Sequence, residues 1–106
     1  MAFRVEMYDF ERKQAVEVIT TPGDYIRLCN WADEHLAGSA GSETVSNLRR
    51  NYAAAWFALR RLGRLEELGL PEELTVEAVD AMADRFTVYV ADLEDDELPL
   101  AAEPAS

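Results

Sequence analysis

The sequence has little of what catalysis, metal binding or export requires. Among 106 residues it contains one cysteine and one histidine, and it has no run of about 18 apolar residues that could cross a membrane. A lone cysteine forms no internal disulfide, so Cys29 fits a reducing compartment such as the cytoplasm. The first ten residues, MAFRVEMYDF, carry charges where an export signal needs a continuous apolar segment. We therefore expect a cytoplasmic protein with no membrane partner.

Basic residues are scarce in the second half of the chain. Residues 1–65 carry nine Lys or Arg and eight Asp or Glu, whereas residues 66–106 carry one Arg and thirteen Asp or Glu. The first part therefore carries a net charge of +1 and the second a net charge of −12, which together give the −11 of the chain. Such a surface repels a nucleic-acid backbone or an anionic membrane. A partner protein with a basic surface fits this distribution, and so does a solvated acidic tail without a partner.

The few residues suited to chemistry are not grouped for it. Asp33, Glu34 and His35 are consecutive, so on a helix they point in different directions and cannot converge on one ion. Cys29 has no histidine on its own helical face to act as a base. The acidic run 94–97 lacks the alternating carboxylates and the glycine of a calcium loop. We expect no catalytic residue, no cofactor and no metal site, and hence no enzyme.

The beginning of the chain predicts a β-hairpin over residues 3–20. Phe3, Val5 and Met7 alternate with polar side chains, and Val16 and Val18 do so after a short polar turn. The next segment, Thr21-Pro22-Gly23-Asp24, is a strong helix start with a cap, a proline and a capping-box acid. It predicts a helix over 22–37 with one apolar face. That face consists of Tyr25, Leu28, Cys29, Ala32 and Leu36, with Ile26 and Trp31 at its margins.

The longest predicted helix, over 43–63, organises the rest of the chain. At 100° per residue its apolar stripe comprises Val45, Leu48, Tyr52, Ala55, Trp56, Leu59 and Leu62. We expect Trp56 and Leu59, in the middle of the stripe, to be buried. The other face carries Ala53, Ala54, Phe57 and Ala58 among arginines. Small residues allow another element to come close, so this helix should have neighbours on two sides.

A third helix is predicted over 75–93, capped by Thr75. A strand over residues 86–90 competes with its second half, because Thr87-Val88-Tyr89-Val90 has high strand propensity. We favour the helix because the 3.6-residue period continues through this segment. Residues 94–106 contain two prolines and dense acid and are expected to form a disordered acidic tail. The sequence thus predicts a mainly α (α+β) fold, with a single domain over 1–93.

Half of the basic residues lie on or just after the central helix, at Arg49, Arg50, Arg60, Arg61 and Arg64. They could pair within the chain with the glutamates of residues 66–77, or they could dock an acidic segment, including the tail of another copy. A nucleic-acid face is the third alternative, and the acidic second half disfavours it. On the docking interpretation the partner-binding residues are Arg49, Arg50, Phe57, Arg60 and Arg61.

The order of these segments resembles the tail assembly chaperones of long-tailed phages and prophages. The matching positions are the helix start at 21–25 and the phrase Trp56-Phe57-Ala58-Leu59-Arg60-Arg61. The resemblance implies a non-catalytic protein that binds the tape-measure protein before the tail polymerises. It also implies a longer form made by ribosomal frameshifting. Shielding a long client needs several copies, so we expect a homo-oligomer.

Two further functions are compatible with the residues. The acidic second half suits a regulatory or DNA-mimicking protein that occupies the basic site of a nucleic-acid enzyme. The third alternative is a small structural protein of the virion, such as a head–tail joining component.

Overall fold

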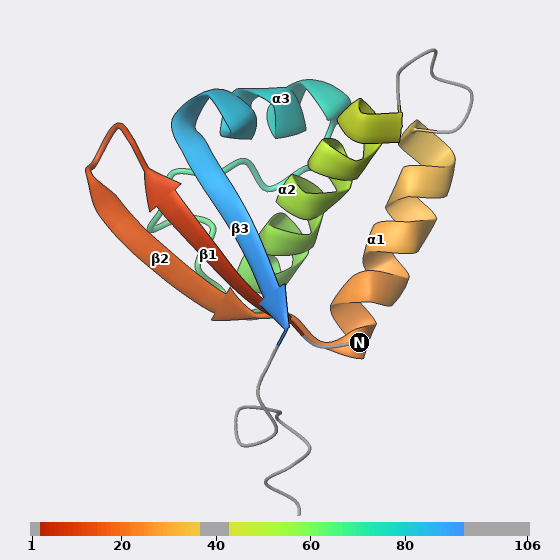
Figure 1. Ribbon diagram of the computed structural model, residues 1–106, viewed down its shortest axis with the longest axis horizontal. Helices are drawn as coiled ribbons and strands as arrows, with labels where there is room; N and C mark the ends of the chain where they lie inside the picture. Colours follow the sequence, from red (N-terminus) through yellow and green to blue (C-terminus); the bar gives the residue numbers. More distant parts are fainter. Residues whose placement is uncertain (1–2, 37–42, 93–106) are drawn as a thin grey trace, which may run out of the picture.

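The computed structural model describes residues 3–36 and 43–92, which form an α+β fold (Figure 1). The elements in chain order are β1 (Phe3–Asp9), β2 (Gln14–Ile19), α1 (Pro22–His35), α2 (Glu43–Arg61), α3 (Val76–Arg85) and β3 (Phe86–Asp92). The strands make one antiparallel sheet in the order β2-β1-β3. Figure 1 shows α2 between this sheet and α1, so the layers are sheet, α2 and α1. None of the helices in the described part of the chain is long and apolar enough to cross a membrane.

The predicted hairpin is confirmed, and it is completed by a strand from the far end of the chain. Val5 of β1 stands opposite Val18 of β2 on one side and Val90 of β3 on the other. Two strands alone are marginal in water, and a third strand with a packed face is what makes such a sheet stable. The side chains of Val5 and Val18 point to the covered face and are buried, whereas Glu6 and Glu17 point to the open face.

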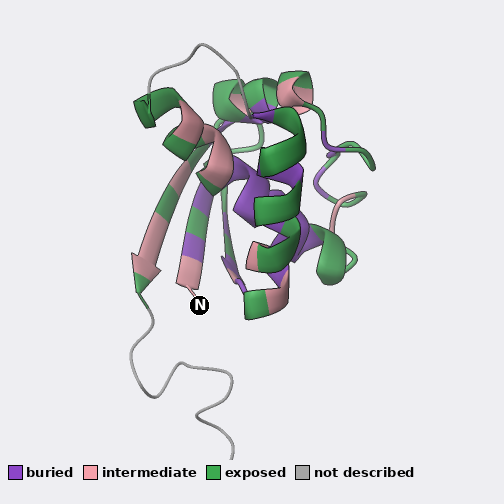
Figure 2. Ribbon diagram, turned by 90° about the vertical axis from the view of Figure 1, so that its right-hand side faces the viewer, coloured by how far each residue is buried: buried purple, intermediate pink, exposed green. Residues whose placement is uncertain are grey.

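Helix α2 is buried over the eight consecutive residues 52–59, because it has the sheet on one side and α1 on the other (Figures 1 and 2). Trp56 is 2% exposed and Leu59 0%, which confirms that both belong to the core. The alanines among these residues allow the close approach of both neighbours. The two ends of the predicted stripe lie outside the core, since Leu48 is 53% exposed and Leu62 48%.

Helix α1 begins as the sequence predicts. Thr21 Oγ1 accepts a hydrogen bond from the Asp24 amide, and the Asp24 carboxylate accepts one from the Thr21 amide, which is a complete capping box. Its buried face is rotated relative to the prediction. Cys29 was expected on that face and is exposed, whereas Trp31, expected at the margin, is buried. The rotation follows from Trp31, whose indole Nε1 donates to the carbonyl oxygen of Leu74 at 2.8 Å and brings the ring inward.

Both tryptophans hold the segment between α2 and α3. Trp56 Nε1 donates to the Pro71 carbonyl oxygen at 2.9 Å, and Trp31 Nε1 donates to that of Leu74. The same segment buries three leucine side chains, Leu68, Leu70 and Leu74. A buried indole needs an acceptor for its N–H, and here the acceptors are backbone carbonyls of a connecting segment. The connection is therefore part of the core.

The predicted helix over 75–93 is wrong in its second half. Thr75 does cap α3, but the helix ends at Arg85 and β3 begins at Phe86 without an intervening loop. Phe86, Val88 and Val90 fit a period of two as well as they fit a helical stripe, so periodicity alone does not decide between the two. Pairing with β1 selects the strand, because all seven residues of β3 stand opposite residues of β1. The strand over 86–90, the competing prediction, is confirmed, and the emphasis on a mainly α fold was too strong.

The predicted boundary at residue 93 stays a prediction. The acidic tail expected over residues 94–106 lies outside the described part of the chain.

Candidate functional site

The five predicted partner-binding residues fall into two groups at opposite ends of α2. Arg49 lies near the α3 end, where its Nε and Nη2 atoms each donate to an Asp80 carboxylate oxygen at 3.0 Å. This paired geometry raises the pKa of Arg49. Arg50, its neighbour, is partly buried at the same end. Phe57, Arg60 and Arg61 line a depression at the other end.

That depression has a volume of about 260 Å³, and we call it the arginine depression; it is lined by Arg27, Phe57, Arg60 and Arg61. Its internal anion is Asp24, which is 0% exposed and lies 3.1 Å from Arg61 Nε and 3.2 Å from Arg27 Nη1. Arg61 Nη2 also donates to the Ile19 carbonyl oxygen at 2.8 Å. Arg61 therefore joins α2 to both β2 and α1.

Arg60 is held differently from the other arginines of the depression. Its guanidinium carbon lies 5.7 Å from the centre of the Trp56 ring, a cation–π contact. None of the carboxylates in residues 3–36 and 43–92 forms an ion pair with it. Phe57, predicted with the arginines to bind a partner, is only 7% exposed, so it contributes a small apolar floor to the depression. Arg64, the fifth arginine of the predicted cluster, pairs with Glu67 at 3.3 Å.

A second hollow, the apolar groove, lies between the first half of α2 and α3. Its volume is about 340 Å³, and it is lined by Val45, Leu48, Arg49, Tyr52, Val79, Asp80 and Ala83. Leu48 is the most exposed of its large apolar side chains, at 53%. The Arg49–Asp80 ion pair stands among these apolar residues as the charged part of the lining. An apolar hollow between two helices with a polar border is the kind of surface that receives side chains of another helix.

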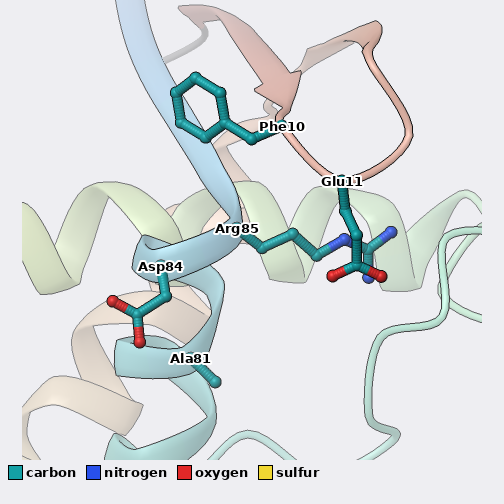
Figure 3. Close-up of a pocket in the computed structure, with 5 residues that line it drawn as sticks. All are labelled: Phe10, Glu11, Ala81, Asp84 and Arg85. Carbon is teal, nitrogen blue, oxygen red and sulfur yellow. The ribbon is translucent and has the colours of Figure 1, made fainter.

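A third hollow, of about 570 Å³, lies where the hairpin turn meets the end of α3 (Figure 3). The figure shows Glu11 and Arg85 approaching one another from the turn and from α3, with Phe10 above them. Arg85 has a structural role: its Nη2 and Nε atoms donate to the two carboxylate oxygens of Asp9 at 2.8 and 3.2 Å. This hydrogen-bonded ion pair lowers the pKa of Asp9 from its ordinary 3.8 to about 2. The Asp9–Arg85 ion pair therefore joins the end of β1 to the end of α3.

The residues considered for chemistry are not brought together. Cys29 is exposed on α1, beside Tyr25, Ile26 and Asn30. The His35 ring stacks on Trp31 with 5.0 Å between ring centres, and its Nδ1 lies 3.0 Å from the Trp31 carbonyl oxygen. Within the described ranges no three Cys, His, Asp or Glu side chains are grouped in a way that could hold a metal ion.

Sequence reasoning missed the half of each hollow that comes from another element. Arg27 belongs to α1, and Val79 and Ala83 belong to α3, whereas all five residues predicted to bind a partner lie on α2. The residue that could have indicated the apolar groove is Leu48. It belongs to the apolar stripe predicted to face the core, yet it lies one turn before Tyr52, where the buried segment of α2 begins. Comparisons of the chain with known protein families, with curated proteins and with solved structures find no match.

Proposed function

We propose that this protein is a non-enzymatic tail assembly chaperone that binds an apolar helical segment of a tape-measure protein in the cytoplasm. The observation that carries the proposal is the apolar groove, in which the stripe of α2 continues past the core. Leu48 lies on the same apolar stripe as the buried Tyr52, yet the Leu48 residue is 53% exposed. Exposing a leucine next to a hollow of about 340 Å³ costs free energy that a bound apolar side chain would recover.

The groove suits a helix better than an extended peptide. It is formed by two helices and is short, so it accepts one or two side chains spaced three or four residues apart on a client helix. The Arg49–Asp80 pair presents both a cation and an anion at this site. It can meet either kind of charge on the client, which suits a chaperone that contacts many successive segments of one long chain.

The resemblance in the sequence supports the same function. Its two matching stretches are the capped start of α1 and the Trp56–Arg61 segment, in which Trp56 is buried in the core while Arg60 and Arg61 line the arginine depression. A long client would be covered by several copies, each binding through its own groove. Self-association and the longer frameshifted form therefore belong to this proposal.

The experiment uses as its client a tape-measure protein, which the proposal expects a neighbouring gene to encode. The client is expressed with the full chain, with Leu48→Asp or with Leu62→Asp, and its recovery in the supernatant after centrifugation is measured. Leu62 is a matched control, because it is 48% exposed and is absent from the groove lining. We expect the parent and Leu62→Asp to keep the client in the supernatant and Leu48→Asp to lose it. Equal recovery with all three proteins, or none with any, would refute the proposal.

A further inference from the structure

The arginine depression carries more positive charge than its own carboxylate balances. Three guanidinium groups, those of Arg27, Arg60 and Arg61, line the depression. Arg27 and Arg61 share the carboxylate of Asp24, and Arg60 has no such partner among the described residues, so the formal excess is two positive charges. This excess is located on a chain whose net charge is −11. We propose that the depression is a binding site for the acidic segment 94–97 of the same chain, Glu94-Asp95-Asp96-Glu97.

The acidic segment starts at the correct end of the molecule. Asp92, the last residue of β3, stands opposite Phe3, and the Phe3 carbonyl oxygen accepts a hydrogen bond from the amide of Thr20. Thr20 immediately precedes Thr21, the N-cap of α1. Figure 1 shows the end of β3 and the start of α1 at the same end of the fold. The chain therefore leaves the sheet on the side where Arg27 and Arg61 lie.

The distance to be covered is short. Arg61 binds the carbonyl oxygen of Ile19, and Ile19, Arg4 and Ala91 stand side by side across the three strands. Neighbouring strands are about 4.8 Å apart, so the backbones of Ile19 and Ala91 are separated by about 10 Å. An extended chain advances about 3.3 Å per residue, so residues three to six positions after Ala91 reach about 10 to 20 Å from it. Those positions are the four acids of 94–97.

The chemistry of the depression matches this occupant. Guanidinium forks bind carboxylates through paired hydrogen bonds, and Arg60 is available for such a pair because its cation–π contact occupies only one face of the group. The acidic run is flanked by Leu93 and Leu98, and the depression offers Phe57 as its apolar floor. Exposed ion pairs are weak individually, but a tethered segment acts at an effective concentration of about 1 mM. The internal tail should therefore outcompete a free copy of itself.

The test compares the parent with a full-length variant in which Glu94, Asp95, Asp96 and Glu97 become Gln or Asn. The probe is a fluorescent peptide of residues 93–100, LEDDELPL, and its binding is measured by anisotropy at low salt. We expect the peptide to bind the neutralised-tail variant about tenfold more tightly than the parent, in which the site is occupied. Adding Arg60→Gln to the variant should weaken binding at least fivefold, whereas Arg50→Gln, the same charge change outside the depression, should not.

Three outcomes would overturn the proposal. The first is equal binding of the peptide to the parent and to the neutralised-tail variant. The second is binding that Arg60→Gln and Arg50→Gln weaken equally, which would indicate general charge attraction. The third is a parent dimer in light scattering that the neutralised-tail variant loses, which would place the tail on a second copy. The site does not include Leu48, so this test and the client test can fail independently.

Discussion

Replacing Leu59 with alanine should destabilise the fold strongly, because Leu59 lies in the layer between the sheet and α1. Its side chain is 0% exposed and belongs to the continuous buried segment of α2. The substitution removes three carbon atoms, each worth about 0.8 kcal/mol of burial, which gives a minimum of about 2.4 kcal/mol. A residual cavity adds to this cost, since a helix with neighbours on two sides cannot move to fill the space. The expected loss is about 2–5 kcal/mol.

The natural control is Leu62→Ala, three residues further along the same predicted stripe. Leu62 is 48% exposed, so only about half of its burial is lost and no cavity forms. We expect a cost of about 1 kcal/mol or less. Urea denaturation followed by the fluorescence of the two buried tryptophans, Trp31 and Trp56, measures both variants, with equal m-values required for the comparison. In thermal denaturation, a loss of about 3 kcal/mol lowers Tm by about 12–24 °C for a domain of this size.

Equal denaturation midpoints for Leu59→Ala and the parent would refute the assignment of Leu59 to a packed core. Equal losses for Leu59→Ala and Leu62→Ala would show that Leu62 is packed as closely as Leu59, and would refute the layer arrangement. Only a large difference between the two leucines supports the layer arrangement.

Two further predictions concern the junction between α3 and β3. Asp9→Asn should destabilise the protein near neutral pH, because Arg85 loses its carboxylate partner. The folded pKa of Asp9 is lowered from 3.8 to about 2. The stability that the ion pair contributes is therefore present above about pH 4 and is lost as the pH falls towards 2. Denaturation midpoints of parent and variant should therefore converge between pH 4 and 2, and a constant difference would contradict the lowered pKa. Tyr52→Phe should cost about 1–3 kcal/mol, because the Tyr52 hydroxyl donates to the buried carbonyl of Phe86 at 2.7 Å. Burial also raises the pKa of Tyr52 above its ordinary 10.0, so the folded state retains the proton and the stability of the protein falls as the pH rises past 10. Tyr52→Phe should show a smaller fall in stability over the same pH range. A fall should remain in the variant, because burial also raises the pKa of Tyr25.

Local signals determined the parts of this fold that depend on neighbouring residues. The start of α1 was predictable, because Thr21 and Asp24 satisfy each other's backbone amides within four residues. The hairpin was predictable for a similar reason, since alternating valines and a polar turn specify two strands that are adjacent in sequence. The central position of Trp56 and Leu59 on the α2 stripe predicted their burial.

Tertiary structure alone decided where residues 86–92 belong and which charges meet. Both periods fit Phe86, Val88 and Val90, and the choice of a strand depended on the edge of β1, more than seventy positions earlier in the chain. The ion pairs of Asp9 with Arg85 and of Asp24 with Arg61 have the same origin, because separations of 76 and 37 residues leave no local pattern. The apolar groove and the arginine depression each combine side chains from two helices. A sequence shows the composition of each helical face, but the packing of the layers determines which part of that face is covered and which part stays exposed.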